Sequence, residues 1–480
     1  MRALRCFLIA SSLTLVLAGL SACRTTGSTS AGASAGTTAA AQFQPGSGGT
    51  PPDMPPEGGN GGMMPPPGGV PGASSADITY SGAVEISSAA AESGRRYSSK
   101  KTDQSALLIS TDSAVSIENP TVTKSGSSNG GDSCNFYGLN AAVLVKGGST
   151  TTITGGTIKS SASGANGVFS YGGNGGRNGA AGDGTTVVIS GTSITTSGSG
   201  SGGIMTTGGG VMKAKNLTVS TSGASSAAIR TDRGGGTVTV EGGSYTSSGL
   251  GSPAIYSTAD ITVSDATLVS KLSEGVCIEG KNSITLNNCT LTANNTRRNG
   301  HAQFLDTIMI YQSMSGDADS GTSAFSMNGG TLTSLSGHVF HVTNTNAVIT
   351  LNGVRIVNKD KSGVLLSVCA DGWKGAANIA TLNAAGQELS GSILAGSDAK
   401  LTLNLNSGST FTGSISGTIC NAAGETVSTE TGTVTVSLDG TSTWNLTEDS
   451  YITSFTGDVS RINGNGHTLY VGGKALSLSR

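Results

Sequence analysis

The chain has 480 residues, of which 75 are glycine, 12% are charged and 4% are aromatic, and its formal net charge is −2. An ordinary helical protein of this size is excluded, because it would need far more Leu, Glu, Lys and Arg. The nearly neutral charge does not favour a nucleic-acid-binding surface. Hydrophobic residues still make up 35%, and Val, Ile and Thr are prominent past residue 76, which favours strands over disorder there.

The N-terminus has the features of a secretory signal. Two arginines precede an apolar stretch at residues 6–19, which is too short for a membrane-spanning helix. The sequence LSAC at residues 20–23 then resembles the lipobox of bacterial lipoprotein precursors. The resemblance implies that residues 1–22 are a signal peptide and that Cys23 becomes the lipidated N-terminal residue. Two or three acyl chains would hold the protein stably at the membrane surface.

Residues 23–76 are rich in Gly, Pro, Ser and Thr. Such a composition cannot bury a core, so it predicts a disordered linker between the lipidated cysteine and the rest of the chain. As a coil it would span roughly 40 Å.

From residue 77 onward a short pattern recurs: an apolar residue, four mostly small or polar residues, and a second apolar residue. Recurrence of one short unit along a chain is typical of solenoids. The nine copies are Ile117/Val122, Ile153/Ile158, Ile189/Ile194, Met212/Leu217, Val240/Tyr245, Val263/Leu268, Leu286/Leu291, Met327/Leu332 and Leu351/Ile356.

A second recurring strand lies between these copies. Spacings near 25 residues fit one solenoid turn of three short strands, and longer ones fit a turn with an inserted loop. We expect the insertions at residues 125–138, 172–184, 296–306 and 313–323. The expected strand starts are Leu107, Val143, Val168, Ile204, Ile229, Ile255, Val276, Ile308, Val339 and Val364.

These patterns predict an all-β, single-stranded, right-handed parallel β-helix of about a dozen turns. One turn of four- to six-residue strands cannot bury its apolar face, whereas turns stacked about 4.8 Å apart form a continuous core. We divide the domain, residues 77–480, into an N-terminal cap (77–104), main turns (105–379) and shorter C-terminal turns (380–480).

Several stretches resemble the right-handed parallel β-helix proteins of the pectin-lyase-like superfamily, and in particular surface β-helix proteins of bacteria. The stretches lie at residues 135–148, 225–261, 274–286 and 308–317, and the resemblance covers roughly residues 77–480. It implies a fold more than a function, since members include polysaccharide lyases, glycoside hydrolases, adhesins and carbohydrate-binding proteins. The paired-aspartate motifs of the hydrolases are absent from this sequence.

If the apolar residues of the second strand point inward, their neighbours form an outer stripe. Flat aromatic faces suit sugar rings, and a guanidinium suits a carboxylate, so this stripe is the candidate ligand-binding surface. In the alternative interpretation, Arg230 and Asp232 form a surface ion pair and the aromatic side chains pack beneath the inserted loops. The candidate ligand-binding residues are Phe169, Tyr171, Arg230, Asp232, Arg233, Tyr256 and Tyr311.

Signals for metal binding and for other chemistry are weaker. Asp317 and Asp319 stand two apart in a Ser/Gly loop, like the start of a calcium loop, so Ca²⁺ is a possible ligand there. His338 and His341 are separated by an odd offset, which on a strand predicts opposite faces. No Ser/His/Asp arrangement stands out. A disulfide between Cys277 and Cys289 stays open, because it depends on the distance between their Cα atoms.

We therefore expect a monomeric, lipid-anchored protein of the bacterial cell surface that binds extracellular polysaccharide or a host glycan without cleaving it. The anchor would be its sole membrane contact, and no nucleic-acid partner is expected. The alternatives are an adhesin that binds protein on a host or partner cell and, second, a polysaccharide lyase with an arginine base.

Overall fold

A computed structural model of the chain describes residues 78–174 and 181–478. The predicted signal peptide (1–22), Cys23 and the predicted linker (23–76) lie outside the described residues. Within the described part of the chain, no helix has the length and hydrophobicity needed to cross a membrane.

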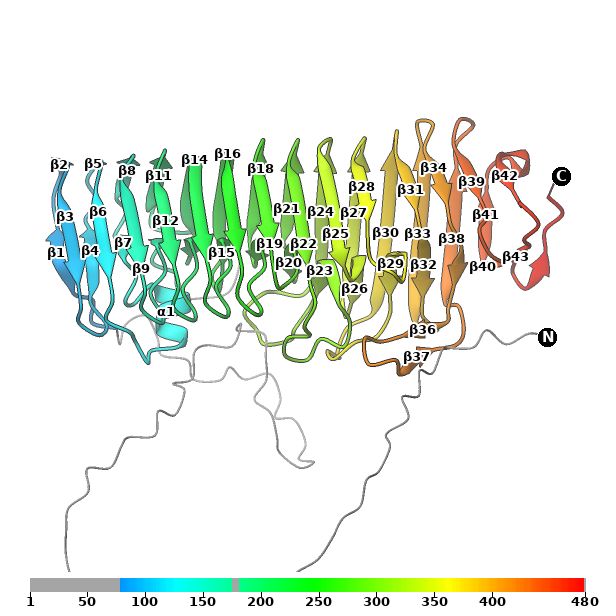
Figure 1. The fold of residues 1–480 in the computed structure, drawn as a ribbon, viewed down its shortest axis with the longest axis horizontal. Helices are drawn as coiled ribbons and strands as arrows, with labels where there is room; N and C mark the ends of the chain where they lie inside the picture. Colours follow the sequence, from blue (N-terminus) through cyan, green and yellow to red (C-terminus); the bar gives the residue numbers. More distant parts are fainter. Residues whose placement is uncertain (1–77, 175–180, 479–480) are drawn as a thin grey trace, which may run out of the picture. The chain divides into compact units, whose positions relative to one another are not determined.

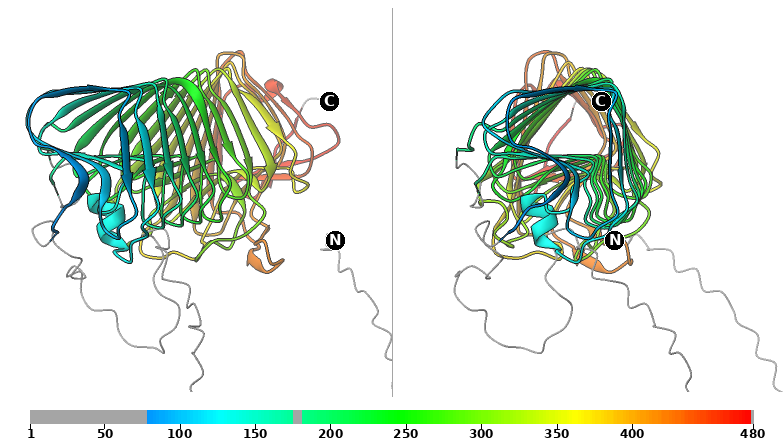
Figure 2. Two further views of the ribbon diagram at one scale, coloured as in Figure 1. Left: turned by 60° about the vertical axis from the view of Figure 1, so that its left-hand side comes forward. Right: turned by 90° about the vertical axis from the view of Figure 1, so that its left-hand side faces the viewer.

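The described residues form a parallel β-helix, as predicted. The turns stack along one axis, and each contributes three short strands to three faces (Figure 1; Figure 2). Nearly all strand pairs are parallel and join a strand to its equivalent one turn later. Each turn thus completes the hydrogen bonding of its neighbours, which explains how strands this short are stable.

The first face, sheet A, has thirteen strands in the described residues. They are β1 (Gly82–Ile86), β4 (Ser105–Ser110), β7 (Val143–Lys146), β10 (Val168–Tyr171), β13 (Ile204–Thr207), β15 (Ile229–Thr231), β17 (Ile255–Ser257), β20 (Val276–Glu279), β23 (Asp306–Tyr311), β26 (His338–Thr343), β29 (Val364–Val368), β32 (Ser392–Ala395) and β35 (Ile415–Ser416).

The other two faces are joined into sheet B by two long strands, β14 (Gly210–Thr221) and β16 (Gly236–Ser247), which run through both. Face B1 also contains β2 (Ala90–Ser93), β5 (Val115–Glu118), β8 (Thr150–Thr154), β11 (Thr186–Ser190), β18 (Asp260–Ser264), β21 (Ser283–Asn287), β24 (Thr322–Asn328), β27 (Asn346–Asn352), β30 (Asn378–Ala385), β33 (Ala399–Asn406), β38 (Thr433–Leu438) and β41 (Ser454–Thr456). Face B2 also contains β3 (Arg96–Ser99), β6 (Thr121–Lys124), β9 (Thr157–Ser160), β12 (Ser193–Thr196), β19 (Thr267–Ser270), β22 (Thr290–Asn294), β25 (Thr331–Ser336) and β28 (Arg355–Asn358).

Three small sheets occupy the C-terminal turns. They are a parallel sheet of β31 (Glu388–Ser390), β34 (Thr410–Thr412), β39 (Thr443–Asn445) and β42 (Ile462–Asn463), an antiparallel pair of β36 (Ile419–Cys420) and β37 (Thr426–Ser428), and a sheet of β40 (Ser450–Ile452), β43 (Leu469–Val471) and β44 (Lys474–Ala475). A short 3₁₀ helix, η2 (Val459–Arg461), precedes β42.

The core consists of columns of apolar side chains. Ile117, Ile153 and Ile189 stack in register and continue through Ala214 to Val240, and each is at most 4% exposed. The predicted stacking is confirmed.

Four predicted positions were wrong by one or two residues. Ala214 and Val219 take the places expected for Met212 and Leu217, while Phe340 and Leu366 take those expected for Val339 and Val364. A shift of two residues keeps the strand phase, and at residues 339–340 apolar residues occur in both phases, so alternation alone could not choose between the positions.

The recurring motif marks the corner between faces B1 and B2. One residue there in each turn has a left-handed backbone, such as Asn119 (φ 47°), Gly155 (φ 65°) and Asp265 (φ 55°). Gly, Asn and Asp tolerate this conformation best, which explains the small polar residues inside the motif.

The corner between face B2 and sheet A depends on close backbone contact. A Cβ on Gly223 would lie 1.8 Å from the carbonyl oxygen of Gly198 one turn earlier, and a Cβ on Gly249 equally close to that of Gly223. Only glycine lets successive turns approach this closely.

The insertions leave the sheets intact, because they project as loops beside sheet A. The predicted loop at 125–138 contains a one-turn helix, α1 (Asp132–Tyr137), which ends at Gly138 in a left-handed conformation. Helix α1 and the β36–β37 pair lie on the same side of the stack (Figure 1). Unequal turn lengths therefore leave most of the strand register unchanged, with a local shift between Ala293 and Asn294 in the β22–β25 pair.

Candidate functional site

The predicted stripe lies on the outer face of sheet A, as its phase predicted. Phe169 pairs with Met205, Met205 with Arg230, and Arg230 with Tyr256 in successive strands. Their strand neighbours, such as Ile229, belong to the central core.

The stripe is nevertheless covered. Phe169, Tyr171, Arg230, Asp232, Tyr256 and Tyr311 are each at most 5% exposed. Helix α1 packs Phe136 and Tyr137 over the N-terminal part of the stripe, where the rings of Tyr137 and Tyr171 meet edge to face at 5.8 Å. The expectation of an open sugar-binding face is therefore corrected: these aromatic side chains pack beneath inserted segments, as the alternative interpretation had it.

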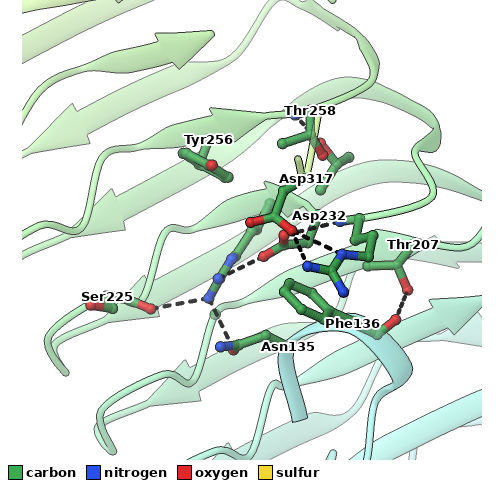
Figure 3. A network of polar contacts seen from close by, with 12 residues as sticks. Asn135, Phe136, Thr207, Ser225, Asp232, Tyr256, Thr258 and Asp317 are labelled. Atoms are coloured by element: carbon green, nitrogen blue, oxygen red, sulfur yellow. Dashed lines mark hydrogen bonds and ion pairs between the residues drawn. The ribbon is translucent and has the colours of Figure 1, made fainter. Parts of the chain in front are cut away.

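The charged residues of the stripe are paired with one another (Figure 3). The Arg230 guanidinium lies 2.8 Å from an Asp232 carboxylate oxygen, and it also donates to the Ser225 carbonyl oxygen and the Asn135 side chain. A buried guanidinium with these three partners has little capacity left for a ligand.

Arg233 has a similar role beside it. Its Nε donates to Asp317 at 2.8 Å, and its guanidinium carbon lies 4.1 Å from the centre of the Phe136 ring (Figure 3). These contacts connect helix α1 to the loop that contains Asp317. The network therefore stabilises the inserted segments that pack over sheet A.

The structure does not bring the two candidate calcium ligands together. Asp317 is bound by Arg233, whereas Asp319 forms a separate ion pair with Lys281 at 2.8 Å. No group of three or more acidic, histidine or cysteine side chains suited to a metal occurs within residues 78–174 and 181–478. With each carboxylate already paired to a cation, the residues do not fit the proposed Ca²⁺ loop.

Two acidic residues that the sequence did not single out also lie beneath the inserted segments that pack over sheet A. Glu274 and Asp306 occupy equivalent places at the start of sheet A in neighbouring turns, since Val276 pairs with Ile308. They are 7% and 1% exposed. Burial raises the pKa of both carboxyl groups, and for Asp306 the negative charges of Glu274 and Asp371 add to this effect.

Glu274 lines a small cavity of about 40 Å³ between sheet A and its covering loops. Three aromatic side chains, Tyr256, Tyr311 and Trp373, form much of its wall, with Cys277 and Met309 at its floor. A signal was present in the sequence: both acids stand two residues before the inward-pointing residue of a sheet A strand.

A second group of polar side chains lies one turn beyond Asp306, at strand β26. Ser367 Oγ is 2.8 Å from Nδ1 of both His338 and His341, and Nε2 of His341 is 3.2 Å from Asp371. The expectations that the two histidines face opposite sides and that no Ser/His/Asp arrangement exists were therefore wrong. The strand begins at a corner there, so simple alternation does not hold for His338.

This Ser/His/Asp group is enclosed. His341 and Ser367 have no exposed surface, and the ring of Phe304 stacks on His341 at 4.7 Å. Burial also lowers the pKa of His338 to about 4. A covered network of this kind suits a structural role better than nucleophilic attack on an external substrate.

The last turns of the helix present a different surface. Tyr451 is 44% exposed, and its ring stacks on that of Tyr470 one turn later, with centres 5.0 Å apart and planes within 6°. Tyr451 also borders an open groove of about 520 Å³. The remaining wall consists of Ser416, Gly417, Thr418, Thr429, Glu430, Thr431, Gly432, Ile452, Thr453, Gly472 and Gly473.

None of the described cysteines, Cys277 and Cys289 included, forms a disulfide. The disulfide left open by the sequence is therefore not formed.

Comparison with known proteins found no match among protein-family models, curated proteins or solved structures. The fold and the site together define the class of protein: a parallel β-helix with inserted segments packed over its first sheet and an exposed tyrosine stack on the small sheet of β40, β43 and β44.

Proposed function

We propose that the protein is a lipid-anchored β-helix of the bacterial cell surface that binds extracellular polysaccharide without cleaving it, and that it acts as a monomer. The observation that carries the proposal is the exposed Tyr451–Tyr470 stack beside an open groove. Sugar rings stack on flat aromatic faces, and the hydroxyl groups and single carboxylate along the groove suit their hydroxyls.

The cell-surface location rests on the N-terminal sequence. Metabolic labelling with a fatty acid should label the wild-type protein and fail to label Cys23→Ser. The matched control is Cys6→Ser, which changes the other N-terminal cysteine and should keep the label. Label on Cys23→Ser would disprove the anchor.

We further propose that the chain is a distant relative of the pectin-lyase-like β-helix proteins, on the basis of its fold and the stretches named above. A lyase with Arg230 or Arg233 as its base is disfavoured, since both guanidinium groups are already paired with carboxylates. A lyase would also release unsaturated products that absorb in the ultraviolet.

A glycan array with the full-length protein in detergent tests the binding proposal. Loss of the Tyr451 ring should weaken retention of polysaccharide about tenfold, which corresponds to about 1.4 kcal/mol, whereas Tyr451→Phe should bind like the wild type. Leu335→Ala is the matched control, because Leu335 is comparably exposed at 38% but lies far from the groove in sequence and on strand β25.

Three results would overturn the proposal. They are the absence of any retained glycan, equal retention by Tyr451→Ala, and ultraviolet-absorbing products from a bound polymer. Retention of a cell-surface protein in place of glycan would favour the adhesin alternative.

A further inference from the structure

The cavity beneath the loops of sheet A is lined by aromatic rings on more than one side. The rings of Tyr311 and Trp373 lie 4.9 Å apart at 53° to each other. The third ring, Tyr256, lies on β17, which strand β20 separates from Tyr311 on β23. All three side chains are at most 7% exposed. Their π faces carry partial negative charge, which attracts cations brought within about 6 Å of a ring centre.

The same cavity contains a carboxyl group that has no cation beside it. Glu274 accepts hydrogen bonds from Ser273 and Asn295, and its neighbour Asp306 has a carboxylate oxygen with no hydrogen-bond partner within the described residues. Neither acid forms an ion pair with another described residue. A buried acid pair without a cation is costly to ionise.

Two other buried acids on this face differ from this pair. Asp232 has Arg230, and Asp317 has Arg233, each at hydrogen-bonding distance. Asp232 and Asp317 are thus each paired with an arginine of the protein, whereas Glu274 is not.

We propose that this cavity binds an organic ammonium group, with Glu274 as the counter-ion and Tyr256, Tyr311 and Trp373 as the aromatic walls. The ligand chemistry is an ammonium carried by carbon, as in an amino sugar or a choline-type headgroup. The site is distinct from the groove at Tyr451 and does not depend on it.

Glu279 is a positioning residue for this site. Its carboxylate accepts hydrogen bonds from the hydroxyl groups of Tyr256 at 2.7 Å and Tyr311 at 3.5 Å. Both rings are therefore fixed before a ligand arrives, which lowers the entropy cost of binding. The indole Nε1 of Trp373, buried and without a hydrogen-bond partner within the described residues, offers a donor to a polar substituent on the ligand.

Binding of a cation should be linked to proton release. Burial raises the pKa of Glu274, and the groups nearest to it are Asp306, the Cys277 thiol and, beyond Asp306, Asp371 with His341. A bound ammonium stabilises the ionised form of Glu274, so affinity should increase as the pH rises through that pKa.

Calorimetry on the full-length protein tests the proposal with three probes: tetramethylammonium, glucosamine and N-acetylglucosamine. The first two carry an ammonium, whereas the third is a neutral amide of the same sugar. We expect saturable binding of at least one ammonium probe, no binding of N-acetylglucosamine, and release of protons on binding. Tighter binding of glucosamine points to an amino sugar, and tighter binding of tetramethylammonium to a choline-type headgroup.

The decisive variant is Glu274→Gln, which keeps the shape of the side chain and should weaken binding at least tenfold. Trp373→Leu should do the same through loss of a cage wall. Glu241→Gln, at an exposed acid on β16, should bind all three probes like the wild type. Tyr451→Ala, in the groove, should bind tetramethylammonium like the wild type, because this probe has no sugar ring to stack there. Hydrogen exchange of β20 and β23 verifies that each variant is folded.

The proposal is overturned if no ammonium probe binds the folded wild-type protein. It is overturned equally if Glu274→Gln binds as well as the wild type, or if N-acetylglucosamine binds as tightly as glucosamine. Because Tyr451→Ala affects only the groove, failure here and failure of polysaccharide binding there are separate results.

Discussion

The outer face of sheet A is a covered interior where inserted segments pack on it, whereas the C-terminal sheet of β40, β43 and β44 has an open surface. Phe169, on β10, has no exposed surface, whereas Tyr451, on β40, is 44% exposed. Both side chains point away from the core of a parallel stack, and both follow the same strand alternation. What separates them is the segment placed over them: helix α1 covers Phe169, and no inserted segment covers the ring of Tyr451.

The comparison shows that strand phase and exposure are separate properties in a solenoid. Phase follows from the backbone, because successive side chains point to opposite faces. Exposure depends on where the inserted loops fold. In this protein the loops form a second, smaller core outside the helix, with its own aromatic clusters and ion pairs.

The largest expected effect comes from breaking an ion pair in the covered region. Asp232→Ala leaves the buried Arg230 guanidinium without its carboxylate, which should cost about 3–5 kcal/mol in the free energy of unfolding. Lys215→Ala breaks an exposed pair with Glu241, whose side chains are more than half exposed, and should cost about 0–1 kcal/mol.

Hydrogen exchange measures this difference locally, which matters because a long stack of turns need not unfold in one step. The amides of β15 should lose protection in Asp232→Ala and keep it in Lys215→Ala. Equal protection in the two variants would mean that the covered ion pair is no more important than a surface pair.

A second variant tests the acids that lack a cation. Asp306 has a raised pKa in the folded protein, so folding favours its protonated form. The stability from this group is complete below the unfolded pKa near 4 and is lost as the pH rises through the folded value. Asp306→Asn stays neutral and should be more stable than the wild type by about 1–3 kcal/mol at alkaline pH.

The advantage of Asp306→Asn should disappear in acid, where the wild-type carboxyl group is protonated as well. Urea unfolding across a pH series measures it. Asp260→Asn, at an exposed acid on β18, is the control and should show no such pH dependence. A constant difference between Asp306→Asn and the wild type would show that Asp306 does not titrate with folding.

Much of the fold could be predicted from the sequence, because it depends on local rules. Stacked columns such as Ile117, Ile153 and Ile189 follow from alternation, and the left-handed corners follow from Gly and Asn in the recurring motif. The side of the sheet on which Arg230 and Tyr256 lie could be predicted for the same reason.

The sites could not be predicted as well, because they depend on contacts between distant segments. Arg233 meets Asp317 across 84 residues, and Arg230 meets Asn135 across 95. Spacing within a strand contains no information about such contacts. The groove at Tyr451 is also formed by segments from separate turns, so no single motif marks it.

Apart from the exposed Lys215–Glu241 control pair, the smallest expected effect on stability is on the C-terminal sheet of β40, β43 and β44. Tyr451→Ala removes a half-exposed ring whose main partner is Tyr470, and should lower the free energy of unfolding by about 0.5–1.5 kcal/mol. Phe169→Ala removes a ring of the same kind from under helix α1 and should cost about 3–5 kcal/mol, because it leaves a cavity. Thermal unfolding of the two variants measures both losses in the free energy of unfolding, and therefore their ratio. A cost for Tyr451→Ala as large as that for Phe169→Ala would mean that the C-terminal tyrosines belong to the packed interior, and the groove would then lose its aromatic binding face.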